Sequence, residues 1–546
     1  MSGEATGHAN IICQHCNKST RLKSNKAVAE EFRRQGRHLF QPSPIRCPNP
    51  ACANHNPQGH PADLFRRHGL TRDGSPRFCC RLCGRTMSVK GPTHKQRRTD
   101  ANSSIFRHLV NKTPFSRLCE LEDISFSSLY GKIEFIYRQC ALFAAAREAK
   151  LPSMDLGERS LSTDKQDYIV NWGDRAKRET IQLTAVATAD VRSGYVFGFT
   201  LNFDPDLTPQ QVEAMWRASG DAQKKPHMRD LARVWTMADY MASKQKSPPM
   251  DRALVPRTGE FVDVNDTVRP DLEVPEVVIE GQQLPKTGVQ VHADYLVHGH
   301  YHLLRHLMRG ASKLNLFVDA EAGMLTACMG AFADWIAEQR ADVVQVRITK
   351  DLTVDERRTL MAKTAKVRAV LAENFPELSD WEIKIDLMRR IVSQKRKNSP
   401  LPSNRLQNLW LADPLPNGAE PDKTMRFVTD VDHLSDTQAA MLLARSTLWP
   451  IDTVFNMIRR RVAMFERPVQ SVRRARRMWH IYAAYDPERV VQMLEIFRVW
   501  YNYLWRGDDD RTPAEKLGLT VGKVRMDHIL GYDLRNLANS HFDQGR

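Results

Sequence analysis

The chain contains 546 residues, of which 42% are hydrophobic, and carries a formal net charge of +16. At about 150 residues per domain, this length predicts three or four domains with real cores. No apolar run approaches the roughly 18 residues of a transmembrane helix, and the N-terminus lacks a signal peptide, so we expect a cytoplasmic protein with no membrane partner. The excess of Lys and Arg (80) over Asp and Glu (64) favours a polyanionic partner, above all nucleic acid.

Closely spaced cysteines characterise the first 100 residues. Two pairs, in "CPNPAC" and "RFCCRLCG", have the spacing of metal-binding knuckles: Cys47 with Cys52, and Cys80 with Cys83. Joined by turn residues and a short strand pattern, they predict a zinc ribbon, in which four thiolates surround one Zn²⁺. Cys13 and Cys16 form a third pair, which either binds a second Zn²⁺ or holds no metal. Residues 1–100 are therefore assigned to a zinc-binding region.

Residues 101–150 are expected to be helical and to bind DNA. The sequence predicts a helix, a break around Ile124 and Ser125, and a second helix capped by Ser127 or Ser128. In a helix-turn-helix the second helix usually enters the major groove. The alternative is an ordinary helical hairpin that joins two domains. The side chains that would face DNA are Ser128, Tyr130, Lys132 and Arg138.

After Leu151 the pattern changes from helices to strands. Strand patterns fill residues 159–172, 180–190, 194–203, 313–319 and 341–349, with helical patterns before and after the fourth. The order β-β-β-α-β-α-β is that of the ribonuclease H-like α/β fold. We assign the remaining parts of the chain as follows: a catalytic core from 151–203, 289–350 and 440–470, insertions at 204–288 and 351–439, and a helical C-terminal region at 471–546.

Two aspartates fall where this fold places metal-binding carboxylates. Asp164 lies in the first strand, and Asp319 ends the fourth, after the apolar run in "KLNLFVD". Carboxylates from neighbouring strands, with a third from a later helix, hold two divalent metals in this fold, and oxygen ligands suit Mg²⁺ or Mn²⁺. Asp167 competes with Asp164, because strand alternation points the two to opposite faces. We favour Asp164, since Leu161 and Ile169 let its strand run into the core.

The third acid is predicted in the helix that Pro450 opens. Asp452 lies in its first turn, although an aspartate there could also be a simple N-cap. Glu466, fourteen residues later, is the alternative. Arginines crowd the same region, where they would contact the DNA backbone unless they form a solvated helix face. Eight occur within nineteen residues: Arg459, Arg460, Arg461, Arg467, Arg473, Arg474, Arg476 and Arg477.

These features together resemble a bacterial insertion-sequence transposase of the DDE/DDD superfamily. The resemblance rests on the cysteine motif, the helix-turn-helix, Asp164 and Asp319, the helix "IDTVFNMIRRRV" and the C-terminal "FRVWYNYLWRGDDDRTPAEKLGL". It implies that water cuts a phosphodiester at each transposon end with Mg²⁺ or Mn²⁺, and that the freed 3′-hydroxyl attacks target DNA. It further implies double-stranded DNA as the partner, a homodimer or higher oligomer that holds two ends, and a nucleoid-associated location in a bacterium.

Two departures from the family pattern accompany the resemblance. The third acid would be aspartate rather than the commoner glutamate. The spacings of 155 residues from Asp164 to Asp319 and 133 from Asp319 to Asp452 are long, so the insertions are expected to loop out of the sheet. The alternatives are a catalytically inactive, transposase-derived DNA-binding regulator and a structure-specific ribonuclease H-like nuclease.

Overall fold

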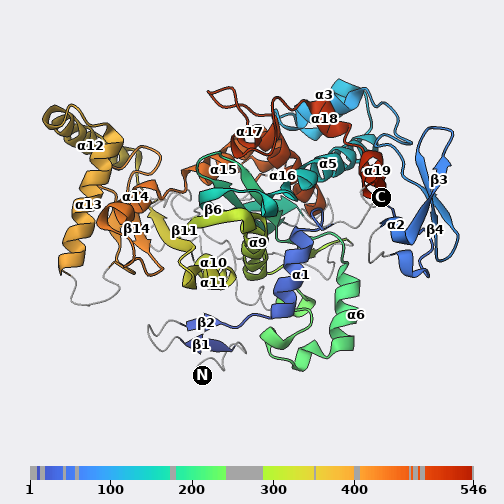
Figure 1. Ribbon diagram of the computed structural model, residues 1–546, viewed down its shortest axis with the longest axis horizontal. Helices are drawn as coiled ribbons and strands as arrows, with labels where there is room; N and C mark the ends of the chain where they lie inside the picture. Colours follow the sequence, from blue (N-terminus) through green and yellow to red (C-terminus); the bar gives the residue numbers. More distant parts are fainter. Residues whose placement is uncertain are drawn as a thin grey trace. The chain divides into compact units, whose positions relative to one another are not determined.

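The chain folds as a mixed α/β protein with two compact units (Figure 1). The sheet unit comprises Met1–Gln35, Leu151–Arg460 and Met464–Val491, and the cysteine unit comprises Gly36–Lys150, Arg461–Ala463 and Gln492–Arg546. The computed structural model describes the following residues: 9–12, 19–40, 45–55, 61–171, 180–240, 287–321, 323–349, 352–398, 406–466, 469–470, 478–479, 482 and 486–543.

A seven-stranded mixed sheet forms the centre of the sheet unit. Its strand order is β13-β14-β12-β11-β6-β7-β8. β11 runs parallel to both β6 and β12, and the other neighbours are antiparallel. The five predicted strands are therefore confirmed. The strands are β6 (Gly157–Asn171), β7 (Thr180–Asp190), β8 (Val196–Leu201), β11 (Ala311–Asp319), β12 (Ala341–Ile348), β13 (Leu411–Ala412) and β14 (Lys423–Phe427).

Helices cover both faces of this sheet. β11 and β12 are buried along most of their length, because strands covered on both faces bury alternate side chains on each side. On one face, His300 of α9 (Ala293–Leu307) lies 2.7 Å from Thr188 Oγ1 of β7. On the other, the ring of Phe455 in α15 (Trp449–Arg461) lies 5.6 Å from the ring of Phe199 in β8. The helix expected between β11 and β12 breaks at Phe332 into α10 (Met324–Ala331) and α11 (Ala333–Ala337).

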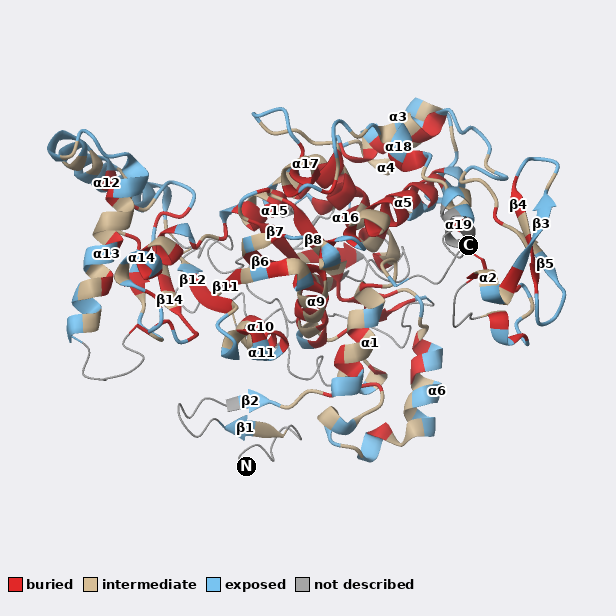
Figure 2. Ribbon diagram, in the orientation of Figure 1, coloured by how far each residue is buried: buried red, intermediate tan, exposed pale blue. Residues whose placement is uncertain are grey.

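The segment 351–439 does not loop out of the sheet as expected. Its helices are α12 (Val354–Asn374), α13 (Asp380–Asn398) and the start of α14 (Asp436–Arg445), but its strand β14 pairs antiparallel with β12. β12 would otherwise be an edge strand with unpaired backbone groups, and β14 satisfies them. Figure 2 shows that α12 is exposed along almost all of its length.

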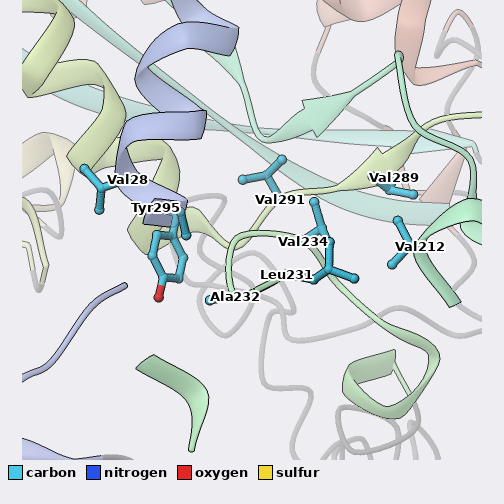
Figure 3. Packing of buried hydrophobic residues seen from close by; sticks show 9 residues of the cluster. Val28, Val212, Leu231, Ala232, Val234, Val289, Val291 and Tyr295 are labelled. Atoms are coloured by element: carbon cyan, nitrogen blue, oxygen red, sulfur yellow. The ribbon is translucent and has the colours of Figure 1, made fainter. Parts of the chain in front are cut away.

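The first part of the segment 204–288 also packs on the sheet unit. β9 (Phe203–Asp204) pairs with β10 (Val289–Gln290), and α6 (Pro209–Ser219) follows β9. Helix α1 (Asn25–Gln35), which we assigned to the zinc-binding region, packs against α9 in this unit. One apolar cluster joins these elements (Figure 3): Ala27, Val28, Val212, Leu231, Ala232, Val234, Val289, Val291 and Tyr295.

The cysteine unit combines a small antiparallel sheet with helices from both ends of the chain. Gln139 of α5 (Phe126–Glu148) donates hydrogen bonds to the carbonyls of Leu530 and Tyr532, so the C-terminal helices pack on the predicted helix-turn-helix. The strands are β3 (Phe65–Leu70), β4 (Pro76–Cys80) and β5 (Thr86–Ser88). The helices are α2 (Pro61–Leu64), α3 (Ala101–Leu109), α4 (Phe115–Glu122), α5 (Phe126–Glu148), α16 (Pro487–Tyr503, which begins in the sheet unit), α17 (Pro513–Leu517), α18 (Met526–Leu530) and α19 (Leu534–Asp543).

Two further hairpins of the described chain belong to the sheet unit. β1 (Asn10–Ile12) pairs with β2 (Ser19–Arg21), and β15 (Val469–Gln470) pairs with β16 (Met478–Trp479), both antiparallel. Each of these strands has only two or three residues. The seven-stranded sheet is therefore the scaffold for the candidate site.

Candidate metal centres

Two aspartates of the central sheet lie side by side. β11 runs parallel to β6 with Val318 opposite Thr163, so the next residues, Asp319 and Asp164, are neighbours on one face of the sheet. Asp164 is only 4% exposed. Each carboxylate accepts a hydrogen bond from the backbone N–H of the residue that follows it, at 2.7 Å for Asp164 and 2.6 Å for Asp319. The fold thus brings together the two acids that the sequence predicted.

Glu321 completes a group of three carboxylates with these aspartates. One oxygen atom from each of Asp164, Asp319 and Glu321, here called the acid cluster, lies within 4.8 Å of the other two. Lys165 Nζ lies 2.7 Å from Glu321 Oε1. Oxygen ligands at these separations suit a hard divalent cation such as Mg²⁺. We did not predict Glu321 from the sequence, although its position two residues after Asp319 was a usable signal.

Asp167, the competing aspartate of β6, lies on the opposite face of the sheet from Asp164. It lies three residues from Asp164 on a regular strand, so the two side chains point to opposite faces. Its Oδ1 accepts a hydrogen bond from Thr184 Oγ1 at 2.6 Å, and burial raises its pKa. Asp167 is not a member of the acid cluster among the described residues.

Helix α15 carries Asp452 over the sheet face to which Asp164 points. Asp164 and Phe199 belong to one cross-strand row through β7, and the ring of Phe455 packs on Phe199. Asp452 lies one helical turn before Phe455 and is partly buried, whereas Glu466 is exposed. Within the described chain, neither acid belongs to the acid cluster. Asp452 as the third acid therefore remains a prediction.

Four cysteines of the cysteine unit converge on one point. Their sulfur atoms lie within 4.8 Å of one another, close enough to hold a metal such as zinc. Cys47 Sγ is 3.3 Å from Cys83 Sγ, and Cys52 Sγ is 3.8 Å from Cys80 Sγ. In a tetrahedron with zinc–sulfur bonds of about 2.3 Å, sulfur atoms are about 3.8 Å apart. The donor set and its spacing therefore fit Zn²⁺.

A hydrogen bond and burial affect individual sulfur atoms of this cysteine cluster. Asn54 Nδ2 donates a hydrogen bond to Cys80 Sγ at 3.4 Å, and burial raises the pKa of Cys47 to about 12. The neighbouring Cys79 lies outside the cluster, with its Sγ 3.3 Å from the Gly84 carbonyl. The third predicted pair, Cys13 and Cys16, lies outside the described residues.

The predicted helix-turn-helix forms with one change at its turn. Asp123 ends α4 in the left-handed region (φ 50°), and α5 begins at Phe126. The N-cap of α5 is Ser125, not Ser127 or Ser128. Ser125 is the last extended residue of the turn, and its hydroxyl accepts a hydrogen bond from the Ser128 N–H at 3.2 Å.

Three of the four predicted DNA contacts on α5 are accessible. Ser128, Tyr130 and Arg138 are exposed. Lys132 is only 5% exposed, and its ammonium donates hydrogen bonds to the carbonyls of Arg97 and Arg98, both at 2.6 Å. Burial also lowers the pKa of Lys132. The ammonium group of Lys132 therefore holds the loop before α3 against α5 and does not face an external ligand.

The predicted arginine run is described only in part. Arg460 is exposed, Arg459 donates a hydrogen bond to Asn456 Oδ1 at 2.6 Å, and Arg461 stacks over the Trp500 ring at 4.7 Å. The rest of the run lies outside the described residues: Arg467, Arg473, Arg474, Arg476 and Arg477.

No protein-family model and no curated protein matches the chain. Among the described residues, we find no helix with the length and apolar character needed to cross a membrane. The argument for a function therefore depends on the two clusters and on the sheet that holds one of them.

Proposed function

We propose that this protein is a DNA transposase of the DDE/DDD type, which cuts transposon ends and joins them to target DNA. The observation that carries the proposal is the acid cluster, in which Asp164 and Asp319 are neighbours on parallel strands. The strand order β8-β7-β6-β11-β12 supports a ribonuclease H-like core. In that fold the first three strands are likewise antiparallel, and the fourth and fifth are parallel to the first.

The acid cluster provides what metal-dependent phosphoryl transfer requires of a protein. Mg²⁺ or Mn²⁺ held there would activate the attacking oxygen and stabilise the leaving oxygen. Asp164 and Asp319 are held by backbone N–H groups, so their oxygen atoms need little reorganisation to bind a cation. The ion pair with Lys165 would orient the carboxylate of Glu321.

The cysteine unit fits a DNA-binding role in the same proposal. Zn²⁺ at the cysteine cluster would join the loop that holds Cys47 to the end of β4 and so fix the small sheet. The exposed residues Ser128, Tyr130 and Arg138 would meet DNA from α5. Two transposon ends must be held at once, so we expect a homodimer or a higher oligomer on DNA.

A strand-transfer assay tests the proposal. Labelled DNA that carries the terminal repeats is incubated with the protein, a plasmid target and Mg²⁺. We expect joined products from the wild type, loss of at least a hundredfold in Asp319→Asn, and full activity in the control Asp355→Asn. Asp355 is a suitable control because it lies on α12 and is 92% exposed. Cleavage without joining would indicate a nuclease, and binding without cleavage would indicate a regulator; either result refutes the proposal.

The same assay identifies the third acid. Glu321→Gln and Asp452→Asn are compared in parallel, with Glu466→Gln as a third variant. If Asp452 binds the second metal, the strand-transfer activity of Asp452→Asn should be as low as that of Asp319→Asn. Glu321→Gln should then keep part of its activity at a high concentration of Mg²⁺. The opposite order would assign the role to Glu321 and would remove Asp452 from the site.

A further inference from the structure

Two aromatic side chains lie at the start of the exposed face of α5. Phe126 is 48% exposed and Tyr130 is 38% exposed, and their ring centroids are 6.3 Å apart. The ring of Phe115, the first residue of α4, packs edge-on against Tyr130 at 6.2 Å. Phe126 and Tyr130 are four residues apart, so both lie on one side of α5, at the end that follows the turn. Aromatic rings that are held together at the surface indicate a contact site.

Gly131, next to Tyr130 on this face, is not required by any packing that the described residues make. It lies inside α5 and is exposed, and a Cβ atom added to it would meet no atom within 4 Å. A glycine inside a helix lowers stability relative to alanine, because glycine loses more backbone entropy on folding. The bare backbone at Gly131 therefore destabilises the free protein, and it fits a partner that approaches the helix closely.

The charges on and beside this face fit the major groove of double-stranded DNA. Arg138 is exposed farther along α5, and Lys132 holds the loop that carries the exposed Arg97 against the helix. These two arginines would meet the phosphate groups that border the groove. Glu134, also exposed on this face, would repel phosphate groups, but inside the groove a carboxylate accepts a hydrogen bond from the amino group of cytosine.

We propose that Phe126 and Tyr130 recognise thymine in the major groove by packing on its C5-methyl group, and that Gly131 lets the backbone of α5 approach closely enough for this contact. Thymine presents that methyl group in the major groove, where apolar side chains recognise it. The first residues of a recognition helix are also the ones that reach the edges of the bases. The inference rests on the proposed function, because it takes the partner to be DNA.

Replacement of thymine by uracil tests the methyl contact, because the two bases differ only in that group. The probe is the duplex that the full-length protein selects from a pool of random sequence, resynthesised with deoxyuridine at each thymine in turn. Burial of one methyl group should change the affinity about fourfold. We expect a loss of this size at one thymine or more. Phe126→Ala should bind the thymine and uracil duplexes equally at the position that it contacts, whereas Arg138→Ala should weaken both and keep their ratio.

Gly131→Ala tests the close approach, because its effects on stability and on binding should have opposite signs. Alanine should raise the midpoint of thermal unfolding, since it favours the helix. It should weaken binding to the selected duplex about fifteenfold, the loss of two methyl contacts. The matched control is Gly330→Ala on α10, because Gly330 is also exposed and an added Cβ atom would meet nothing within 4 Å. This control should leave DNA binding unchanged.

Several results would overturn the inference: no selected duplex, equal binding of the thymine and uracil duplexes by the wild type, or unchanged binding by Gly131→Ala. A loss of self-association in Phe126→Ala without a change in DNA binding would also overturn it, because a second copy of the chain would then cover this face. The strand-transfer assay separates the two proposals. Discrimination against uracil without joined products leaves the thymine contact and refutes the transposase, whereas joined products with equal binding of both duplexes do the reverse.

Discussion

Glu420 offers a quantitative test of how the segment 351–439 is tied to helix α15. Its side chain is 2% exposed and accepts hydrogen bonds from Thr447 Oγ1 at 2.6 Å and from the Leu448 N–H at 2.9 Å, just before α15 begins. It also lies 2.8 Å from Lys423 Nζ. Replacement of Glu420 by glutamine keeps the shape and one acceptor oxygen but removes the charge.

The expected effect follows from the balance of buried charge. Lys423 is 3.1 Å from Asp413, and Lys384 is 2.6 Å from the same carboxylate. Two cations and two anions therefore neutralise one another, and Glu420→Gln leaves one positive charge uncompensated in a site whose members are at most 12% exposed. Removing one partner of a buried pair costs about 3–5 kcal/mol in the free energy of unfolding.

Urea titration of the wild type, Glu420→Gln, Lys423→Met and the double variant measures this cost. Because the double variant restores charge balance, its loss should fall below the sum of the single losses by about 2–3 kcal/mol. Glu373→Gln, on the exposed part of α12, is the control and should change stability by less than about 0.5 kcal/mol. A loss below about 1 kcal/mol in Glu420→Gln, or strictly additive losses, would refute the reasoning, because that is how an exposed pair behaves.

Two further outcomes are expected. Cys52→Ser should abolish stoichiometric zinc measured by atomic absorption and make the cysteine unit sensitive to protease, whereas Cys79→Ser should retain zinc; loss of zinc from both would contradict the ligand set. Burial lowers the pKa of His300 to about 3, so the folded protein keeps it neutral while the unfolded chain binds a proton below about pH 6.5. The free energy of unfolding should therefore fall by about 2 kcal/mol from pH 6.5 to pH 5 because of His300. Urea titrations of His300→Gln should show a fall that is smaller by this amount. An identical fall in both proteins would exclude His300 as the cause.

The strands of the central sheet could be predicted because their apolar patterns are local. β11 is a short apolar run that ends in Asp319, and β6 carries Asp164 at the level where β11 ends. What local pattern cannot supply is which segments meet across space. β14 lies in a segment that we assigned as an insertion, because its pairing with β12 depends on a backbone edge that lies about 80 residues earlier in the chain.

The sequence did not predict the role of a side chain correctly where its partner lies in another segment of the chain. Lys132 has the spacing of a residue on a recognition helix, yet the carbonyls of Arg97 and Arg98 bind its ammonium. Glu321 follows the strand that carries Asp319, and only the folded chain shows that its carboxylate reaches both aspartates. In each case the sequence indicates the residue type, and the geometry decides whether its charge is available.

The pairing of β14 with β12 limits how this protein can be shortened. Deletion of residues 351–439 would expose the backbone of β12 from Val344 to Ile348, and an open strand edge would favour self-association. Helix α12 is different, because Thr364 is the only buried residue among the 21 that compose it. A shorter chain that keeps the sheet closed should therefore be sought by removing α12 alone, with β13 and β14 left in place.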